Sequence, residues 1–89
     1  MNNRILLTLR ASHRPLTIGE LATKLDCEWR TAAKATMHLY TQRYIFPDGD
    51  RRHGTEMVPA WSLTSAGESL AGEIRAAQRM EEASDDDEA

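Results

Sequence analysis

The most constraining feature of the 89-residue chain is the stretch of residues 17–45, TIGELATKLDCEWRTAAKATMHLYTQRYI. It opens with Thr17 and Glu20 at the spacing of a capping box, in which two side chains satisfy backbone N–H groups at a helix start. Apolar residues then recur at helical spacing and predict one buried face, made of Ile18, Leu21, Ala22 and Leu25. The sequence therefore predicts a short helix from Thr17 that ends in a turn at residues 26–28.

A second helix follows directly, from residues 26–28 to Gln42 or Arg43. Asp26 is the expected N-cap, and Glu28 in the first turn suits the positive end of the helix dipole. The inward positions follow the i, i+3, i+4, i+7 pattern and are Ala32, Ala35, Thr36 and Leu39. The opposite face is mostly polar, so this helix is expected to pack along one side and leave the other free.

Residues 44–63 predict a β-hairpin. Tyr44, Ile45 and Phe46 favour a strand, and residues 47–50, PDGD, have the composition of a turn. Residues 56–63 form the expected returning strand, with Val58, Trp61 and Leu63 facing inward. Pro59 lacks a backbone N–H, so it is expected at a sheet edge or a bulge.

Two further helices are expected outside this central region. Residues 3–12 place Ile5, Leu6 and Leu9 on one stripe, and Pro15 prevents the helix from continuing. Ser65 and Glu68 repeat the capping-box spacing and open a last helix. Its apolar stripe is Leu70, Ile74 and Ala77.

The net charge of −3 hides an uneven distribution. Residues 81–89, EEASDDDEA, hold six of the 14 acidic residues and no basic one, so residues 1–80 carry 11 basic against eight acidic groups. The final segment contains no large apolar side chain that a core could bury. The sequence thus predicts one mildly basic domain over residues 1–78 and a disordered acidic tail over residues 79–89.

The order of these elements resembles a winged helix-turn-helix DNA-binding domain over roughly residues 4–78. Residues 16–25 match the packing positions of the first motif helix, and residues 43–45 match the junction into the first wing strand. Residues 61–67, WSLTSAG, are similar to the aromatic-x-Leu-Thr-x-x-Gly exit of MarR-like and PadR-like regulators. The resemblance implies a mainly α fold with a small β-hairpin wing, of the α+β class. Two features depart from the pattern: Asp26 replaces the usual turn glycine, and the helix starts with the bulky pair Glu28-Trp29. We expect no attached ligand-binding domain.

Two clusters are candidate DNA contacts. The helix predicted from residues 26–28 to residue 42 or 43, the third in chain order, exposes Trp29, Arg30, Thr31, Lys34 and His38. The predicted wing tip exposes Arg51, Arg52 and His53. Arginine reads guanine in the major groove, and arginines on a wing tip suit the negative minor groove. The alternative for the first cluster is an ordinary solvated helix face, and the alternative for the second is a loop that only increases solubility. For Trp29, contact with DNA and cover of the core over the turn stand equally open.

The sequence contains no residues that support a membrane span, a metal site or an enzyme. The single Cys27 suits a reducing cytoplasm, and no apolar run approaches the roughly 20 residues of a membrane span. His13, His38 and His53 lack metal-ligand spacing. Without a phosphate-binding loop or a nucleophile–base pair, we expect no metal, no cofactor and no enzymatic activity.

The sequence therefore predicts a protein that binds double-stranded DNA selectively, acting as a small prokaryotic, viral or plasmid transcriptional regulator and as a homodimer. The alternative is a winged-helix protein–protein interaction module, an adaptor or inhibitor that does not bind DNA. The modest charge of the body, the exposed Trp29 and the acidic tail keep this alternative open.

Overall fold

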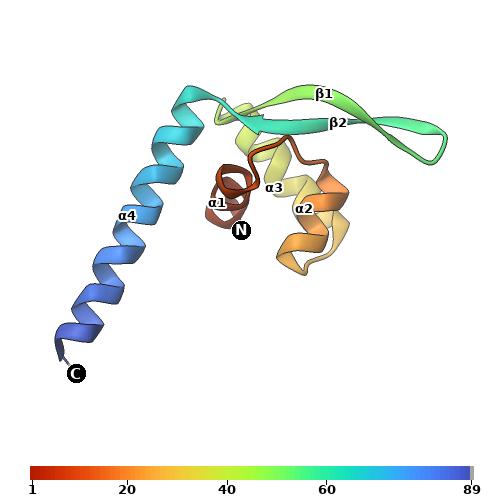
Figure 1. The fold of residues 1–89 in the computed structure, drawn as a ribbon. Helices are drawn as coiled ribbons and strands as arrows, with labels where there is room; N and C mark the ends of the chain where they lie inside the picture. Colours follow the sequence, from red (N-terminus) through yellow and green to blue (C-terminus); the bar gives the residue numbers. More distant parts are fainter. Residues whose placement is uncertain (89) are drawn as a thin grey trace.

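The computed structural model describes the backbone of residues 1–88 and the side chains of residues 1–80. The elements run α1 (Asn2–Ser12), α2 (Ile18–Leu25), α3 (Trp29–Thr41), β1 (Ile45–His53), β2 (Glu56–Leu63) and α4 (Ser65–Glu88). Helices α1, α2 and α3 pack together beneath the β1–β2 hairpin, and α4 leaves the hairpin at the end opposite its tip (Figure 1). The expected mainly α architecture with a β-hairpin wing is confirmed; we call residues 45–63 the wing.

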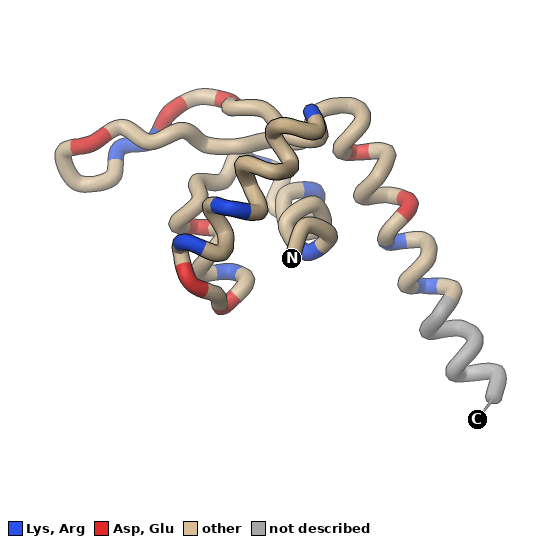
Figure 2. Tube along the Cα trace, turned by 180° about the vertical axis from the view of Figure 1, so that it is seen from behind, with Lys and Arg blue, Asp and Glu red and all other residues tan. Residues whose placement is uncertain are grey.

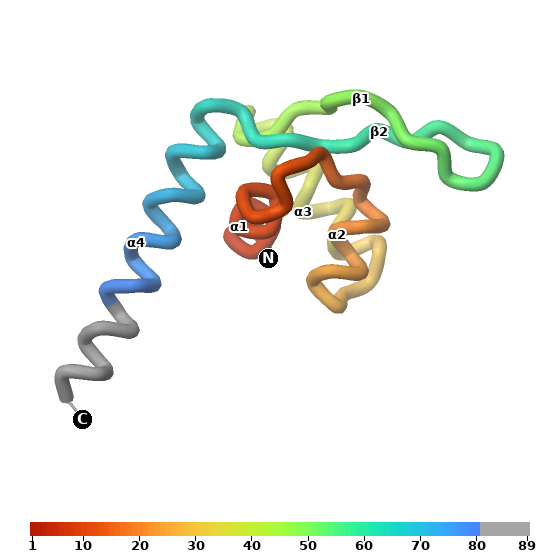
Figure 3. The backbone as a smooth tube through the Cα atoms, in the orientation of Figure 1, coloured from red at the N-terminus to blue at the C-terminus, as the bar shows by residue number. Residues whose placement is uncertain are grey.

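The core is built from the stripes that helical periodicity predicts. Each of the first three helices contributes its apolar face, the wing adds Ile45 and Trp61, and α4 adds Ala71. Figure 3 follows the chain from α1 through the helix pair into the wing and shows that α1 lies beside both α3 and the start of α4. The largest fully buried side chains are Ile5, Leu6, Leu16, Leu21, Leu39, Ile45 and Thr36.

The turn between α2 and α3 differs from the prediction. The capping box at Thr17 and Glu20 is present, with both reciprocal hydrogen bonds at 3.1 Å. Asp26, however, is not the N-cap of α3: it ends α2 in the left-handed conformation, with φ 52°. Its backbone N–H and that of Cys27 donate to the last carbonyls of α2. The chain needs a left-handed residue to reverse here, and aspartate tolerates that conformation better than most residues.

The wing is longer than expected, because residues 47–50 do not form its turn. They lie within β1, where Asp48 and Gly49 oppose the single residue Ala60 in a bulge between the Pro47–Trp61 and Asp50–Pro59 pairs. Gly49 absorbs the distortion with φ 82°. The chain reverses instead at residues 54–55, where Gly54 has φ 64°. Pro59, expected at a sheet edge or a bulge, pairs with Asp50 at the border of this bulge.

The start of α4 depends on a close approach between helix and strand. Thr64, not Ser65, caps α4: its Oγ1 accepts from the N–H of Gly67 at 3.1 Å and donates to the carbonyl of Arg43 at 2.7 Å. A Cβ on Gly67 would stand 1.9 Å from the carbonyl oxygen of Tyr44. The Leu-Thr-x-x-Gly pattern therefore encodes a helix cap and a position without room for a side chain.

Helix α4 continues past residue 78, where the domain was expected to end, and Arg79 and Met80 are still helical. The side chains of residues 81–89 lie outside the described ones, so the disordered acidic tail and the domain boundary stay predictions. Within the described residues, no helix combines the length and apolar character that crossing a membrane requires.

Replacing Gly67 by Ala should destabilise the fold, because the new methyl group collides with backbone rather than with a movable side chain. We expect a loss of about 1–3 kcal/mol in the free energy of unfolding, measured by urea denaturation. Gly72→Ala is the matched control: it lies in the same helix with nothing within 4 Å of the new Cβ, and should stabilise by up to about 1 kcal/mol. Equal stability of the two variants would contradict this account of Gly67.

Candidate nucleic-acid interface

Helix α3 presents most of the predicted contacts on one exposed face. Its inward residues are buried in the core, so Arg30, Thr31, Lys34 and His38 all face solvent. These four line one open groove of about 700 Å³, whose opposite wall is the start of α1. Two cations and two hydrogen-bonding side chains therefore converge on a single accessible surface.

Asn2 belongs to this surface and was missed by the sequence analysis. Its Nδ2 donates to Nδ1 of His38 at 3.0 Å, which requires the imidazole tautomer protonated at Nε2. The two residues are 36 positions apart, and only the packing of α1 against α3 brings them together. No local pattern at the start of the chain signals this contact.

Trp29 lies at the first position of α3 with 61% of its surface exposed. That exposure rules out the alternative in which it closes the core over the turn. It lines a second, smaller groove of about 180 Å³ together with the start of α2 and the wing residues His53, Val58 and Pro59. Trp29 and His53, predicted separately from the helix and the wing, thus share one surface between these elements.

Arg51 is not at the wing tip, contrary to the prediction. It lies within β1, paired with Val58, and is only half-exposed. Its guanidinium turns back onto the helical body: Nη1 binds the carboxylate of Glu20, and Nη2 donates to the carbonyl of Pro15. Arg51 therefore joins the wing to the N-terminus of α2.

The Glu20 carboxylate is the centre of this junction. Besides Arg51, it binds Arg14 at 3.3 Å and accepts the Thr17 N–H of the capping box. Burial alone would raise the pKa of Glu20, but the Thr17 hydrogen bond and the charges of Arg51 and Arg14 outweigh it and hold the pKa below its ordinary value. The carboxylate thus stays ionised where the wing meets α2.

Arg52 and His53 keep the exposed positions expected of a wing. Arg52 is exposed, and among the described side chains it makes no ion pair, whereas Arg51 is held at the junction with Glu20. His53 pairs with Glu56 next to the reversal and borders the grooves beside α2. Of the three predicted wing residues, these two are available to an outside partner.

The charges around the two clusters are mixed. Figure 2 shows Lys and Arg along α3 and α1, and acidic residues on the wing and at the turn between α2 and α3. Asp26 and Glu28 of that turn lie four and two residues before Arg30. No group of three His, Cys, Asp or Glu residues able to hold a metal occurs in the part of the chain that the structure describes.

Comparison with known proteins supports the architecture. Neither a protein-family model nor a curated protein matches the sequence. Among solved structures, an S. aureus MepR–DNA complex is similar with a TM-score of 0.79 and 17% identity, over 99% of this chain and 63% of that one. The fold is that of a winged helix-turn-helix domain.

Two further solved regulators share the fold. A variant of ZitR from Lactococcus lactis is 23% identical, with a TM-score of 0.75 over 97% of this chain and 56% of that one. The adhesin competence repressor AdcR from Streptococcus pyogenes is 22% identical, with a TM-score of 0.69 over 89% of this chain and 55% of that one. The chain thus spans somewhat more than half the length of these proteins.

Glu20→Gln should lower the free energy of unfolding at neutral pH by about 1–2 kcal/mol, because it removes a charged acceptor from two arginines. A lowered folded-state pKa stabilises the fold above the unfolded-state value, about 4.3 for Glu, and this contribution disappears as pH falls through the folded-state value. The difference between wild type and variant should therefore shrink below about pH 4.

Denaturation curves at several pH values measure this difference. Glu73→Gln is the control, because Glu73 is exposed and makes no ion pair with any described side chain. A Glu20→Gln effect that is the same at pH 3 as at pH 7 would show that the charge of Glu20 does not hold the junction.

Proposed function

We propose that this chain binds double-stranded DNA with sequence selectivity and acts as a small transcriptional regulator of a prokaryote, virus or plasmid. The observation that carries the proposal is the single exposed groove on α3 that gathers Arg30, Thr31, Lys34 and His38. In a helix-turn-helix domain this helix enters the major groove. The similarity to MepR, which is solved as a DNA complex, supports the same use of the fold.

Each side chain on α3 has a chemistry suited to this role. Arg30 has the planar fork that pairs with O6 and N7 of guanine, and Lys34, one turn further on, offers a point charge to a base or phosphate. Thr31 and His38 can hydrogen-bond backbone or base edges. Asn2 fixes the orientation of His38. Trp29 offers a flat apolar surface to a thymine methyl group or a sugar.

The wing contributes through Arg52 and His53. Both are exposed near its end, where a basic side chain can reach the minor groove or flanking phosphates. Arg51 acts indirectly, because its bonds to Glu20 and Pro15 fix how the wing leaves the body. Arg51 is therefore a positioning residue.

We further propose a homodimer as the DNA-binding unit, acting in the cytoplasm without a catalytic step or cofactor. One recognition helix contacts few base pairs, and two copies related by a two-fold axis read two half-sites about one DNA turn apart. If the protein retained no DNA duplex in a gel-shift assay at low salt, the protein-binding alternative would be favoured. The exposed Trp29 is the feature that supports this alternative.

Arg30→Ala should weaken binding to the preferred site by about 1–3 kcal/mol and relax preference at one base pair. Selection from random duplexes followed by titration measures both effects. Arg52→Ala is the matched control, since it also removes one exposed arginine and should weaken all sequences alike. Unchanged preference in Arg30→Ala and in Lys34→Ala would rule out base readout by α3.

The two wing arginines should behave differently. Arg52→Ala should lower the slope of log affinity against log salt by about 1 and leave stability within about 0.5 kcal/mol of wild type. Arg51→Ala should lower the free energy of unfolding by about 1–2 kcal/mol, because Glu20 and the Pro15 carbonyl lose their partner. Salt titrations and urea denaturation test both; a fully stable Arg51→Ala would remove its assigned role.

A further inference from the structure

Helix α3 exposes an apolar band beside its cations. Trp29, Ala33 and Met37 follow one another at intervals of four residues, which places them on one flank of the helix. Trp29 and Met37 are 61% and 47% exposed, and Ala33 is partly buried. The exposed Tyr40 continues the band toward the end of the helix. The DNA contacts proposed above use only Trp29 of these four residues.

The apolar band is interleaved with the cations. Ala33 lies three positions after Arg30, and Met37 lies three positions after Lys34. Side chains at this spacing are neighbours on the surface of a helix. On its other side, the row of cations borders the groove that contains His38. A partner that binds both cations of α3 therefore also meets the apolar band.

The ends of the band are engaged beside the wing. Trp29 lines the small groove next to the wing, and Tyr40 packs edge-to-face against Trp61 with ring centroids 5.2 Å apart. Ala33 and Met37, in the middle of the band, line neither this groove nor the larger one beside α1. They are the part of the band that is open to an outside partner.

The dimensions of DNA bring this middle part close to the bases. The major groove is about 12 Å wide, and an α-helix with its side chains is about 10–12 Å across, so a helix in the groove meets it over much of its exposed face. Cationic side chains suit the edge of guanine, whereas the methyl group of thymine is contacted by apolar side chains. Contact with such a methyl group would also remove the apolar surface of Met37 from water.

We propose that Ala33 and Met37 recognise thymine methyl groups in the major groove, next to the base pairs that Arg30 and Lys34 are proposed to contact. The two apolar side chains lie about 6 Å apart along the helix axis, further than the roughly 3.4 Å between successive base pairs, so each meets a different base pair. The preferred DNA site therefore carries thymines beside its guanines. This inference rests on the proposed function, because it names the DNA that the same helix face selects.

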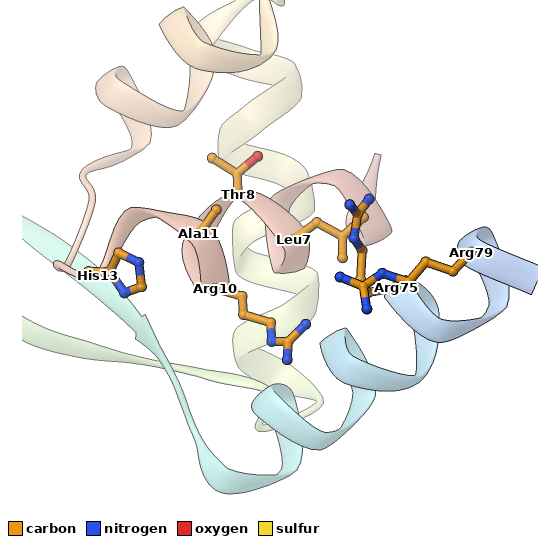
Figure 4. Close-up of a pocket in the computed structure, with 7 residues that line it drawn as sticks. All are labelled: Leu7, Thr8, Arg10, Ala11, His13, Arg75 and Arg79. Carbon is orange, nitrogen blue, oxygen red and sulfur yellow. The ribbon is translucent and has the colours of Figure 1, made fainter. Parts of the chain in front are cut away.

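A second basic surface of the molecule lacks this pairing of cations with exposed large apolar side chains. Arg10 of α1 and Arg75 and Arg79 of α4 surround an open groove of about 640 Å³ (Figure 4). The other residues that line it are Leu7, Thr8, Ala11 and His13, and none of them is among the exposed large apolar side chains. Attraction of phosphate to such cations does not depend on the DNA sequence. Its arginines are therefore suitable controls for effects of charge alone.

The test compares a DNA duplex with the same duplex in which deoxyuridine replaces thymine, a change that removes the methyl group and keeps the base pair. The duplex is the one enriched from random sequences by the full chain. Replacing its thymines one at a time should weaken wild-type binding about fourfold at each of two positions, because one buried methyl group is lost. A selected site without thymines, or an affinity that no replacement changes, would overturn the inference.

Two variants assign the methyl contacts to residues. Met37→Gln keeps the length and the helix propensity of the side chain but presents an amide, and Ala33→Ser adds a hydroxyl group. Each variant should lose the effect of deoxyuridine at one of the two positions. Met80→Gln, the same change at a residue of α4 that is 72% exposed, and Arg10→Ala are controls and should keep both effects. Effects that persist in both α3 variants would contradict the assignment.

Failure of this inference is distinguishable from failure of the proposed function. A wild-type protein that binds the selected duplex but does not respond to deoxyuridine overturns methyl recognition alone. A protein that retains no duplex at low salt overturns both and points to a protein partner for the apolar band. The deoxyuridine comparison needs only the wild-type chain, so it decides the question even if circular dichroism shows that a variant is unfolded.

Discussion

Two backbone hydrogen bonds between Leu16 and Trp61 fix the wing to the helical body. The N–H of each residue donates to the carbonyl of the other, at 3.0 and 2.8 Å, and both side chains are buried. This short bridge lets the segment after α1 act as a third strand beside β2. The position of β2 then decides the register of the hairpin, the location of Arg51 above α2 and the approach of Gly67 to Tyr44.

Trp61 also joins the wing to α3. Its indole ring packs edge-to-face against Tyr40 of α3, with centroids 5.2 Å apart and an interplanar angle of 62°. A movement of β2 would therefore displace α3, and it would also displace α2 through the ion pair of Arg51 with Glu20. The relative placement of α3 and the wing, on which the proposed contact with two DNA grooves would depend, rests on these few interactions.

Sequence patterns predicted the helices and strands because these elements depend on interactions between residues that are close in the sequence. Helical periodicity identified Leu21, Ala32 and Leu39 as core residues, and the Thr17 and Glu20 side chains satisfy donors only three residues away. The helix ends were less certain: Asp26 has the chemistry of an N-cap and also tolerates a left-handed conformation, so composition alone does not distinguish the two positions.

The errors that matter for the site came from contacts between distant parts of the chain. Both Gly49 and Gly54 suit a reversal, and pairing with β2 decides in favour of the second. Arg51 and Arg52 are indistinguishable in sequence until the longer strand turns one toward Glu20 and the other outward. Asn2 joins the α3 surface only because α1 packs there.

The charge distribution bears on how the proposed DNA-binding surface could act. The net charge of residues 1–80 is small, and Asp26 and Glu28 stand next to the α3 face, so attraction to phosphate alone would give weak binding, and under the proposed function the directed contacts of α3 supply the selectivity. Free acidic segments would oppose even that attraction. Because exposed cations such as Lys24 and Arg43 also lie outside α3 and the wing, charge alone does not define the proposed DNA-binding face.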